Sequence, residues 1–87
     1  MKPVLQSTDK VVLTIAPTGG LHGKEANPRL PEQPEDIIAT FADCYEAGAT
    51  IAHIHVRDKE GRTSADPVIY GEVIAGIKER CPDMITQ

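Results

Sequence analysis

Residues 50–58 read TIAHIHVRD, and the alternation within this stretch indicates the class of fold. If residues 50–56 form a β-strand, successive side chains point to opposite faces of a sheet. One face is then wholly apolar and consists of Ala52, Ile54 and Val56. The opposite face is mostly polar and consists of Ile51, His53, His55 and Arg57. The apolar face suits packing beneath helices. The polar face needs a functional reason, because burying polar groups without partners is costly.

Strand and loop signals lie on both sides of this stretch. A β-branched run at residues 11–16 predicts a first strand covered on both faces, as in a parallel sheet. The segment 17–33 is rich in Gly and Pro and predicts a long loop, which is more often functional than idle. Residues 58–62 predict a turn in which Gly61 supplies the permissive backbone. A third strand starts at residues 84–86.

Two amphipathic helices are predicted between the strands. The first runs from Pro34, which suits the first helical position, to a stop at Gly48. Its apolar stripe consists of Ile37, Ile38, Phe41, Cys44, Tyr45 and Ala47. The second is capped by Asp66, opens at Pro67 and ends before Pro82. Its apolar stripe consists of Ile69, Val73, Ile74 and Ile77.

Composition and charge exclude several classes of partner. The net charge is −4, and the chain has neither a basic patch with aromatic residues nor an apolar run of membrane-span length, so we expect no nucleic-acid or membrane partner. The first residues lack the apolar core and cleavage site of a signal peptide. Cys44 and Cys81 lie in helical patterns and form no disulfide framework. We therefore expect reduced thiols in a cytoplasmic protein.

The number of strand–helix units indicates a partial domain. Strand–helix–strand connections of this length are right-handed crossovers in a parallel sheet, and two such units cannot cover both of its faces. An eight-unit α/β barrel needs roughly 250 residues. Residues 1–87 are therefore expected to form about a third of such a barrel, its N-terminal part. The alternative is a small complete α/β domain that dimerises to cover its sheet.

The histidine pair predicts a metal site. Imidazoles at positions i and i+2 of a strand point the same way and can meet one cation, and neutral imidazole is a good zinc ligand. Because catalytic zinc has three protein ligands, His53 and His55 cannot complete the site alone. His22, in the Gly-rich loop, is expected to be solvated rather than a third ligand. The alternative is a pair of structural histidines bonded to backbone or carboxylate groups.

Other polar residues at the same end of the sheet are weaker candidates. Arg57 can clamp a substrate carboxylate or orient a neighbouring acid, and its alternative is a surface salt bridge with Asp58 or Glu60. Thr18 and the two glycines after it follow the first strand directly, where backbone N–H groups can approach an anion or simply form a tight turn. Three carboxylates are expected to be solvated: Glu25, Glu32 and Glu35.

Four segments in order resemble the N-terminal region of the β-keto acid cleavage enzymes, a family that includes 3-keto-5-aminohexanoate cleavage enzyme. They are LTIAPTGG (13–20), NPRLPEQPEDI (27–37), EAGATIAHIHVRDKEGRTSAD (46–66) and MITQ (84–87). The resemblance implies an α/β fold of the TIM (β/α)8 barrel type, of which this chain is the N-terminal portion. It also implies a zinc cofactor, and acetyl-CoA as co-substrate with a small-molecule β-keto acid, yielding acetoacetate and a new CoA thioester. A homo-oligomeric full-length enzyme is expected.

The resemblance assigns roles to individual residues. It implies that His53 and His55 are zinc ligands, with a third ligand, a glutamate from a late strand, outside the 87 residues. Members that act on an aminated keto acid have an acidic residue in the loop after the first strand. The matching position here is Leu21, which implies a substrate with a neutral or apolar tail.

Two other classes of function remain open on the sequence. Some metal-dependent hydrolase barrels also use two histidines on one strand, although usually the first strand; these enzymes do not need a thioester. A small non-enzymatic α/β protein that binds metal or a partner through its sheet would instead form a stable, well-folded dimer from these residues alone.

Overall fold

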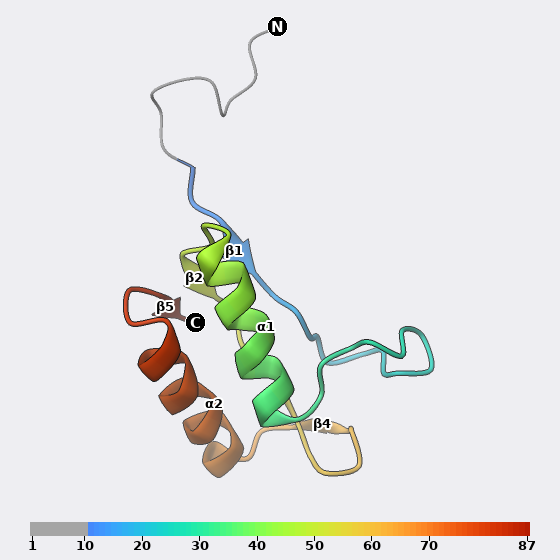
Figure 1. Ribbon diagram of the computed structural model, residues 1–87. Coiled ribbons are helices and arrows are strands. Elements are labelled where there is room, and N and C mark those ends of the chain that lie inside the picture. Colours follow the sequence, from blue (N-terminus) through green and yellow to red (C-terminus); the bar gives the residue numbers. More distant parts are fainter. Residues whose placement is uncertain (1–10) are drawn as a thin grey trace, which may run out of the picture.

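A computed structural model of the chain describes residues 11–87 (Figure 1). The expectation that the chain starts without a signal peptide concerns residues 1–17, of which residues 1–10 lie outside the described part. The elements, in chain order, are β1 (Thr14–Ile15), α1 (Pro34–Glu46), β2 (Ile51–Ala52), β3 (Val56–Arg57), β4 (Thr63–Ser64), α2 (Pro67–Arg80) and β5 (Ile85–Thr86). The predicted alternation of strand and helix is confirmed.

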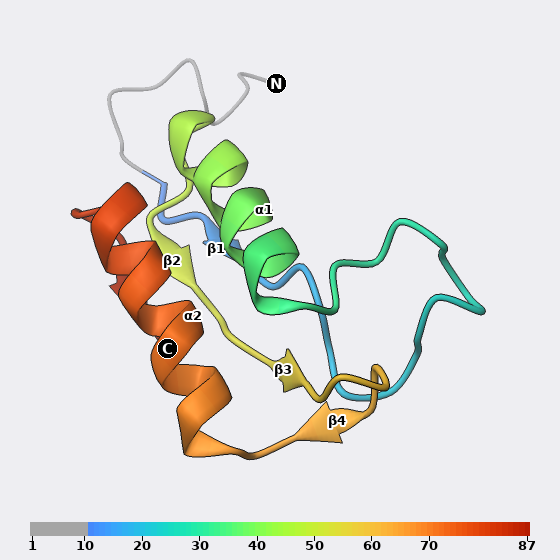
Figure 2. The same cartoon turned by 60° about the horizontal axis from the view of Figure 1, so that its bottom comes forward.

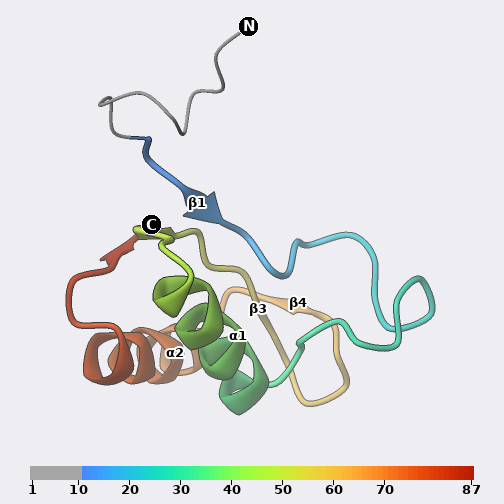
Figure 3. The same ribbon diagram turned by 45° about the horizontal axis from the view of Figure 1, so that its top comes forward.

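The main sheet has the parallel topology that the crossovers predict. Its strand order is β1-β2-β5, and both neighbouring pairs are parallel. The chain reaches each new strand through a helix, and Figure 3 shows α1 and α2 on the same side of the sheet. Both connections therefore have the same hand, as expected for consecutive strand–helix units.

The core lies between this sheet and the two helices. The apolar face of residues 50–56 is buried as predicted: Ala52, Ile54 and Val56 are 0%, 7% and 1% exposed. The helical stripes meet it through Ile37 and Phe41 of α1 and through Val73 and Ile77 of α2. The other predicted stripe residues are partly buried, except that Ala47 is exposed.

The predicted helix boundaries have the expected local causes. Pro34 and Pro67 stand at the starts of their helices, and the Asp66 carboxylate accepts a hydrogen bond from the backbone N–H of Val68 at 2.9 Å. Gly48, just beyond α1, has a φ of 112°, which favours glycine over any other residue. Neither helix has the length and hydropathy of a membrane span within the described residues.

The first strand differs from its prediction. Only Thr14–Ile15 is paired, and Val11, Val12 and Leu13 are 52%, 69% and 45% exposed. The expectation of a strand covered on both faces is therefore wrong within residues 11–87. β1 is an edge strand with one neighbour in the sheet, and both helices pack on the same face.

The strand at 50–56 changes partner along its length. At its start β2 pairs with β1 and β5, and the pairing continues where the N–H of His53 donates to Ile15 O at 2.9 Å. Beyond His55 the chain leaves the main sheet and β3 pairs antiparallel with β4 (Figure 2). The predicted turn at 58–62 joins this hairpin and is confirmed, with Gly61 at a φ of 84°. The hairpin itself was not predicted, because a two-residue β4 shows no alternation.

Two glycines of α2 provide a matched pair for testing the helix–helix contact. A Cβ on Gly76 would overlap Ile38 Cδ1 of α1 and lie 2.9 Å from its Cγ1, whereas a Cβ on Gly71 would have nothing within 4 Å. We expect Gly71→Ala to stabilise the full-length protein by up to ~1 kcal/mol through helix propensity. Gly76→Ala should instead destabilise it by about 1 kcal/mol, because overpacking outweighs that gain. Denaturant unfolding measures both, and an equal gain in stability for the two variants would contradict the close contact.

Candidate functional site

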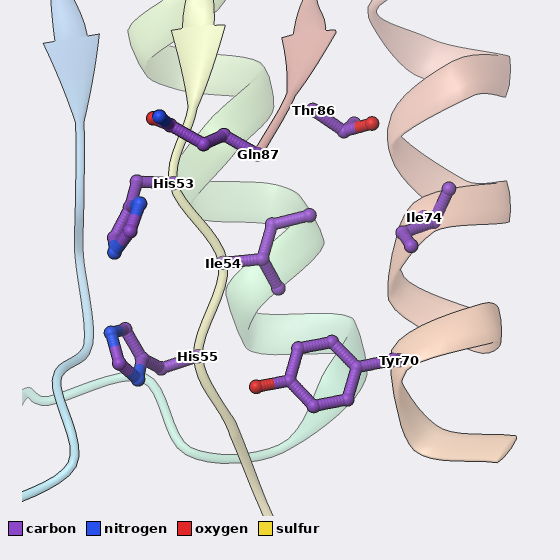
Figure 4. A pocket seen from close by; sticks show the side chains of 7 residues that line it. All are labelled: His53, Ile54, His55, Tyr70, Ile74, Thr86 and Gln87. Atoms are coloured by element: carbon purple, nitrogen blue, oxygen red, sulfur yellow. The ribbon is translucent and has the colours of Figure 1, made fainter. Parts of the chain in front are cut away.

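His53 and His55 lie where the parallel strands end. Both imidazoles project from the same side of the chain, toward β1, whereas the side chain of Ile54 between them points toward α2 (Figure 4). The ring centroids are 5.1 Å apart and the ring planes are inclined by 62°. The alternation predicted from the sequence therefore brings the two rings together at one edge of the sheet.

The two imidazoles have no protein partner among residues 11–87. Neither ring donates or accepts a hydrogen bond there, and both are half-buried. Structural histidines bonded to backbone or carboxylate groups, the alternative considered from the sequence, would need such partners. Unpaired ring nitrogens on neighbouring rings are suitable donors for a divalent metal.

The described residues do not complete a metal site. Within residues 11–87 no three side chains of His, Cys, Asp or Glu lie close enough together to hold an ion. His22 is exposed in the long loop, as the sequence led us to expect. The pair fits a metal as two ligands of a larger set, and the remaining ligands would come from outside residues 11–87.

Arg57 is buried, and its guanidinium donates hydrogen bonds to several protein groups. It is 4% exposed, and it donates to Gly19 O from both Nε (3.2 Å) and Nη2 (2.7 Å). Nη2 also donates to His22 O at 2.7 Å. Nη1 donates to Gly61 O at 2.8 Å and to Glu32 Oε2 at 3.2 Å. All five N–H donors of the side chain are therefore engaged.

These contacts correct two interpretations of Arg57. A surface salt bridge with Asp58 or Glu60 is wrong, because the exposed Arg62 pairs with both of those carboxylates. A clamp for a substrate carboxylate has no free N–H in this arrangement. The third possibility, an arginine that engages a neighbouring acid, matches the geometry, and the acid is Glu32.

Glu32 was missed from the sequence, where it was expected to be solvated. It is 9% exposed, and its carboxylate pairs with Arg57 and lies against Gly61. A Cβ on Gly61 would sit 3.0–3.2 Å from the carboxylate atoms of Glu32, so the glycine leaves room for them. The one signal available in the sequence was Arg57 itself, since an arginine on an inward strand face needs an acidic partner.

Thr18 has a structural role in this part of the chain. Its side chain is 2% exposed, and its hydroxyl donates to Pro31 O at the other end of the long loop. This contact does not test the expectation for Thr18, which concerned backbone N–H groups near an anion, so substrate binding there stays a prediction. The carbonyls of Gly19 and Gly20 turn inward, toward Arg57 and toward the Thr63 hydroxyl (2.8 Å).

Leu21 is solvent-exposed and follows a residue that lies close to His55. Its side chain is 84% exposed. The preceding residue, Gly20, lies against the pair: a Cβ on it would be 4.0 Å from Nδ1 of His55 and 3.6 Å from Oγ1 of Thr63. Figure 2 shows this part of the loop passing beside the β3–β4 hairpin. The loop thus holds the residue before Leu21 close to His55, while Leu21 itself is exposed to solvent.

A cavity of about 370 Å³ adjoins the pair. Its lining residues are His53, Ile54, His55, Tyr70, Ile74, Thr86 and Gln87. The Tyr70 hydroxyl, from α2, points toward the strand near His55 (Figure 4). Tyr70 was not among the residues expected from the sequence, although it lies on the buried stripe of its helix, three residues before Val73, and packs against the core.

Two groups with shifted pKa values are not candidates for chemistry. The backbone N–H of Arg62 holds the pKa of the Asp58 carboxyl below its usual value, and this carboxylate organises the hairpin turn. Burial raises the pKa of the Cys81 thiol, which makes it a poor nucleophile. Cys44 and Cys81 are both free thiols, as predicted.

A family profile described as "beta-keto acid cleavage enzyme" matches residues 10–87. A protein of Fusobacterium nucleatum named 3-keto-5-aminohexanoate cleavage enzyme is 38% identical over 79 residues, 91% of this chain and 29% of the relative. The 3-oxoadipate:acetyl-CoA acetyltransferase of Cupriavidus necator is 34% identical over 80 residues, 92% of this chain and 28% of the relative.

A third relative has another substrate in its name. The 3,5-dioxohexanoate:acetyl-CoA acetone transferase of Paraburkholderia graminis is 36% identical over 77 residues, 87% of this chain and 25% of the relative. The chain therefore spans less than a third of the length of these curated relatives.

Proposed function

The chain belongs to the β-keto acid cleavage enzyme family, and we propose that the full-length protein is an acyltransferase that uses a β-keto acid and acetyl-CoA. In this reaction the β-keto acid R–CO–CH₂–COO⁻ and acetyl-CoA yield acetoacetate and the thioester R–CO–S–CoA. The observation that carries the proposal is the pair of half-buried imidazoles, free of protein partners among residues 11–87, within the matched region.

The proposal includes zinc as the cofactor. His53 and His55 would hold it through their ring nitrogens, with the remaining ligand supplied by the part of the protein beyond this chain. Zinc bound there would supply a Lewis acid that polarises the β-keto oxygen and stabilises enolate charge as the C–C bond breaks. Arg57 has no free donor for the substrate in this arrangement, so we do not expect it to contact the β-keto acid directly.

We also propose that residues 1–87 form a single partial domain, the N-terminal part of a TIM (β/α)8 barrel. Three parallel strands in chain order, each pair joined by a helix on the same face, are the repeating unit of that fold. The candidate site lies at the carboxyl ends of the strands, where such barrels carry their active sites. We further propose that the full-length enzyme is cytoplasmic and forms a homo-oligomer. Sedimentation of the full-length protein measures its oligomeric state.

The reaction is tested with the full-length protein and both substrates. We expect acetoacetate and a new CoA thioester to be formed in equal amounts, and no enzyme-dependent consumption of the β-keto acid when acetyl-CoA is omitted. A metal-dependent hydrolase would consume its substrate without the thioester. Turnover that is independent of acetyl-CoA would therefore overturn the proposed reaction.

Leu21 leads to a prediction about the substrate. The relatives' names include a β-keto acid with an amino group, one with a second carboxylate and one with a neutral tail. Similarity by itself therefore does not indicate which group the substrate of this protein carries at its far end. The Leu21 side chain can neither accept a hydrogen bond nor pair with an ammonium, and an ammonium desolvated beside it would lose hydration without compensation. We expect the full-length protein to prefer a neutral tail.

The matching variant is Leu21→Glu, with Leu21→Gln as the uncharged control. Leu21→Glu should shift kcat/KM toward 3-keto-5-aminohexanoate relative to a neutral keto acid of equal length. Leu21→Gln should shift it less, because an amide lacks the charge. The high exposure of Leu21 limits the size of the shift, since water screens an exposed ion pair. An unmodified enzyme that already prefers the aminated substrate would contradict this role of Leu21.

A further inference from the structure

The guanidinium of Arg57 joins three segments that are far apart in the sequence. It binds the start of the long loop through Gly19 O and His22 O, and the end of that loop through Glu32. It also binds the hairpin turn through Gly61 O. One buried side chain therefore ties both ends of the loop at 17–33 to the β3–β4 hairpin.

Arg57 binds the start of the long loop, and this same part of the loop lies close to His55. Gly20 is directly next to Gly19 in sequence, and a Cβ on Gly20 would be 4.0 Å from Nδ1 of His55. The Thr63 hydroxyl donates to Gly20 O at 2.8 Å and fixes the same point from the hairpin. The position of residues 19–21 relative to His55 therefore depends on the contacts of Arg57.

Glu32 sets the orientation of that guanidinium. Its carboxylate is the one charged partner of Arg57 among the described residues, and it reaches Nη1 in a space left free by the missing side chain of Gly61. A charged partner held in this way restrains the plane of the guanidinium, so the donors to Gly19 and His22 keep their directions.

We propose that Arg57 and Glu32 are positioning residues that hold the loop at 17–33 beside His55 and thereby determine how the β-keto acid binds. This inference rests on the proposed function for its substrate. Neither residue touches the substrate; both act through the loop backbone. Their loss should weaken substrate binding and release the loop, while the zinc ligands stay in place.

The test uses full-length protein with Arg57→Lys and Glu32→Gln. The first variant retains a positive charge but loses the fork of donors that binds several carbonyls, and the second retains an acceptor but loses the negative charge. Matched controls are Arg62→Lys, an exposed arginine on the same hairpin, and Glu35→Gln, an exposed glutamate in the first turn of α1. The kinetic readouts are KM for the β-keto acid, kcat and bound zinc.

We expect both test variants to raise KM by roughly ten- to hundredfold, with kcat changed less and zinc retained, because small misplacements at a site cost that much. The controls should keep wild-type values. An unchanged KM in both test variants, or a loss of zinc that accounts for the change, would overturn the proposal. Glu32→Gln is the milder variant and decides the case if Arg57→Lys does not fold.

A second readout does not depend on activity. The loop carries two exposed tryptic sites, Lys24 and Arg29. Limited trypsin digestion of the native protein should cut there faster in Arg57→Lys and Glu32→Gln than in wild type and the controls. If wild type turns over no β-keto acid, the proposed function fails, yet the digestion still decides whether the pair holds the loop. Equal cutting rates in all variants would overturn that.

Discussion

Replacing His53 or His55 with Ala in the full-length protein should release its zinc and abolish turnover. The two rings are neighbours, with centroids 5.1 Å apart, and no protein group among residues 11–87 competes for their nitrogens. Because changing a residue that only supports a metal ligand already costs roughly 10–100-fold in affinity or activity, loss of a ligand itself should exceed that range. Bound metal, measured by elemental analysis beside kcat/KM, checks the expectation.

The chain offers its own control for this experiment. Besides His53 and His55, the sequence has one further histidine, His22, which is exposed in the long loop. His22→Ala should keep stoichiometric zinc, because only the backbone carbonyl of this residue takes part in the contacts around Arg57. Stoichiometric zinc retained in the His53→Ala/His55→Ala double variant would refute the metal assignment, whatever the activity.

Replacing Arg57 with Met should lower the free energy of unfolding of the full-length protein by about 3–5 kcal/mol. Methionine fills part of the space, but it leaves the Glu32 carboxylate buried without its charged partner. It also leaves the carbonyls of Gly19, His22 and Gly61 without their donor. Each unsatisfied buried group adds to the cost. Denaturant unfolding monitored by circular dichroism measures the loss.

Two further variants separate the buried pair from a general effect of losing an arginine. Arg62→Met should cost only about 0–1 kcal/mol, because its ion pairs with Asp58 and Glu60 are exposed to solvent. Glu32→Leu combined with Arg57→Met should recover part of the loss, since the uncompensated charge is gone while the loop carbonyls remain unpaired. A cost for Arg57→Met no larger than for Arg62→Met would mean that the buried pair contributes little.

Several features of the fold followed from local patterns in the sequence. The helix starts at Pro34 and Pro67, the cap at Asp66 and the left-handed glycines Gly48 and Gly61 are all where the sequence placed them. Each depends on the conformational preferences of one or a few neighbouring residues, which tertiary contacts did not override. The burial of the first strand could not be derived in the same way, because it depends on which segments cover that strand.

In the candidate site, too, local geometry could be predicted from the sequence and long-range contacts could not. The sequence by itself determined that His53 and His55 share one side of the chain, because strand geometry alternates side chains with a period of two. Only the tertiary structure decided that Arg57 is saturated by protein groups, that Glu32 is its partner and that Gly20 lies against His55. The contacts of Arg57 with the loop join residues 25 to 38 positions apart, and their formation depends on the path of a Gly- and Pro-rich loop that has no periodic pattern. The face to which a strand residue points follows from local backbone geometry. The partners of a buried charge instead depend on which distant segments of the chain come together in the folded protein.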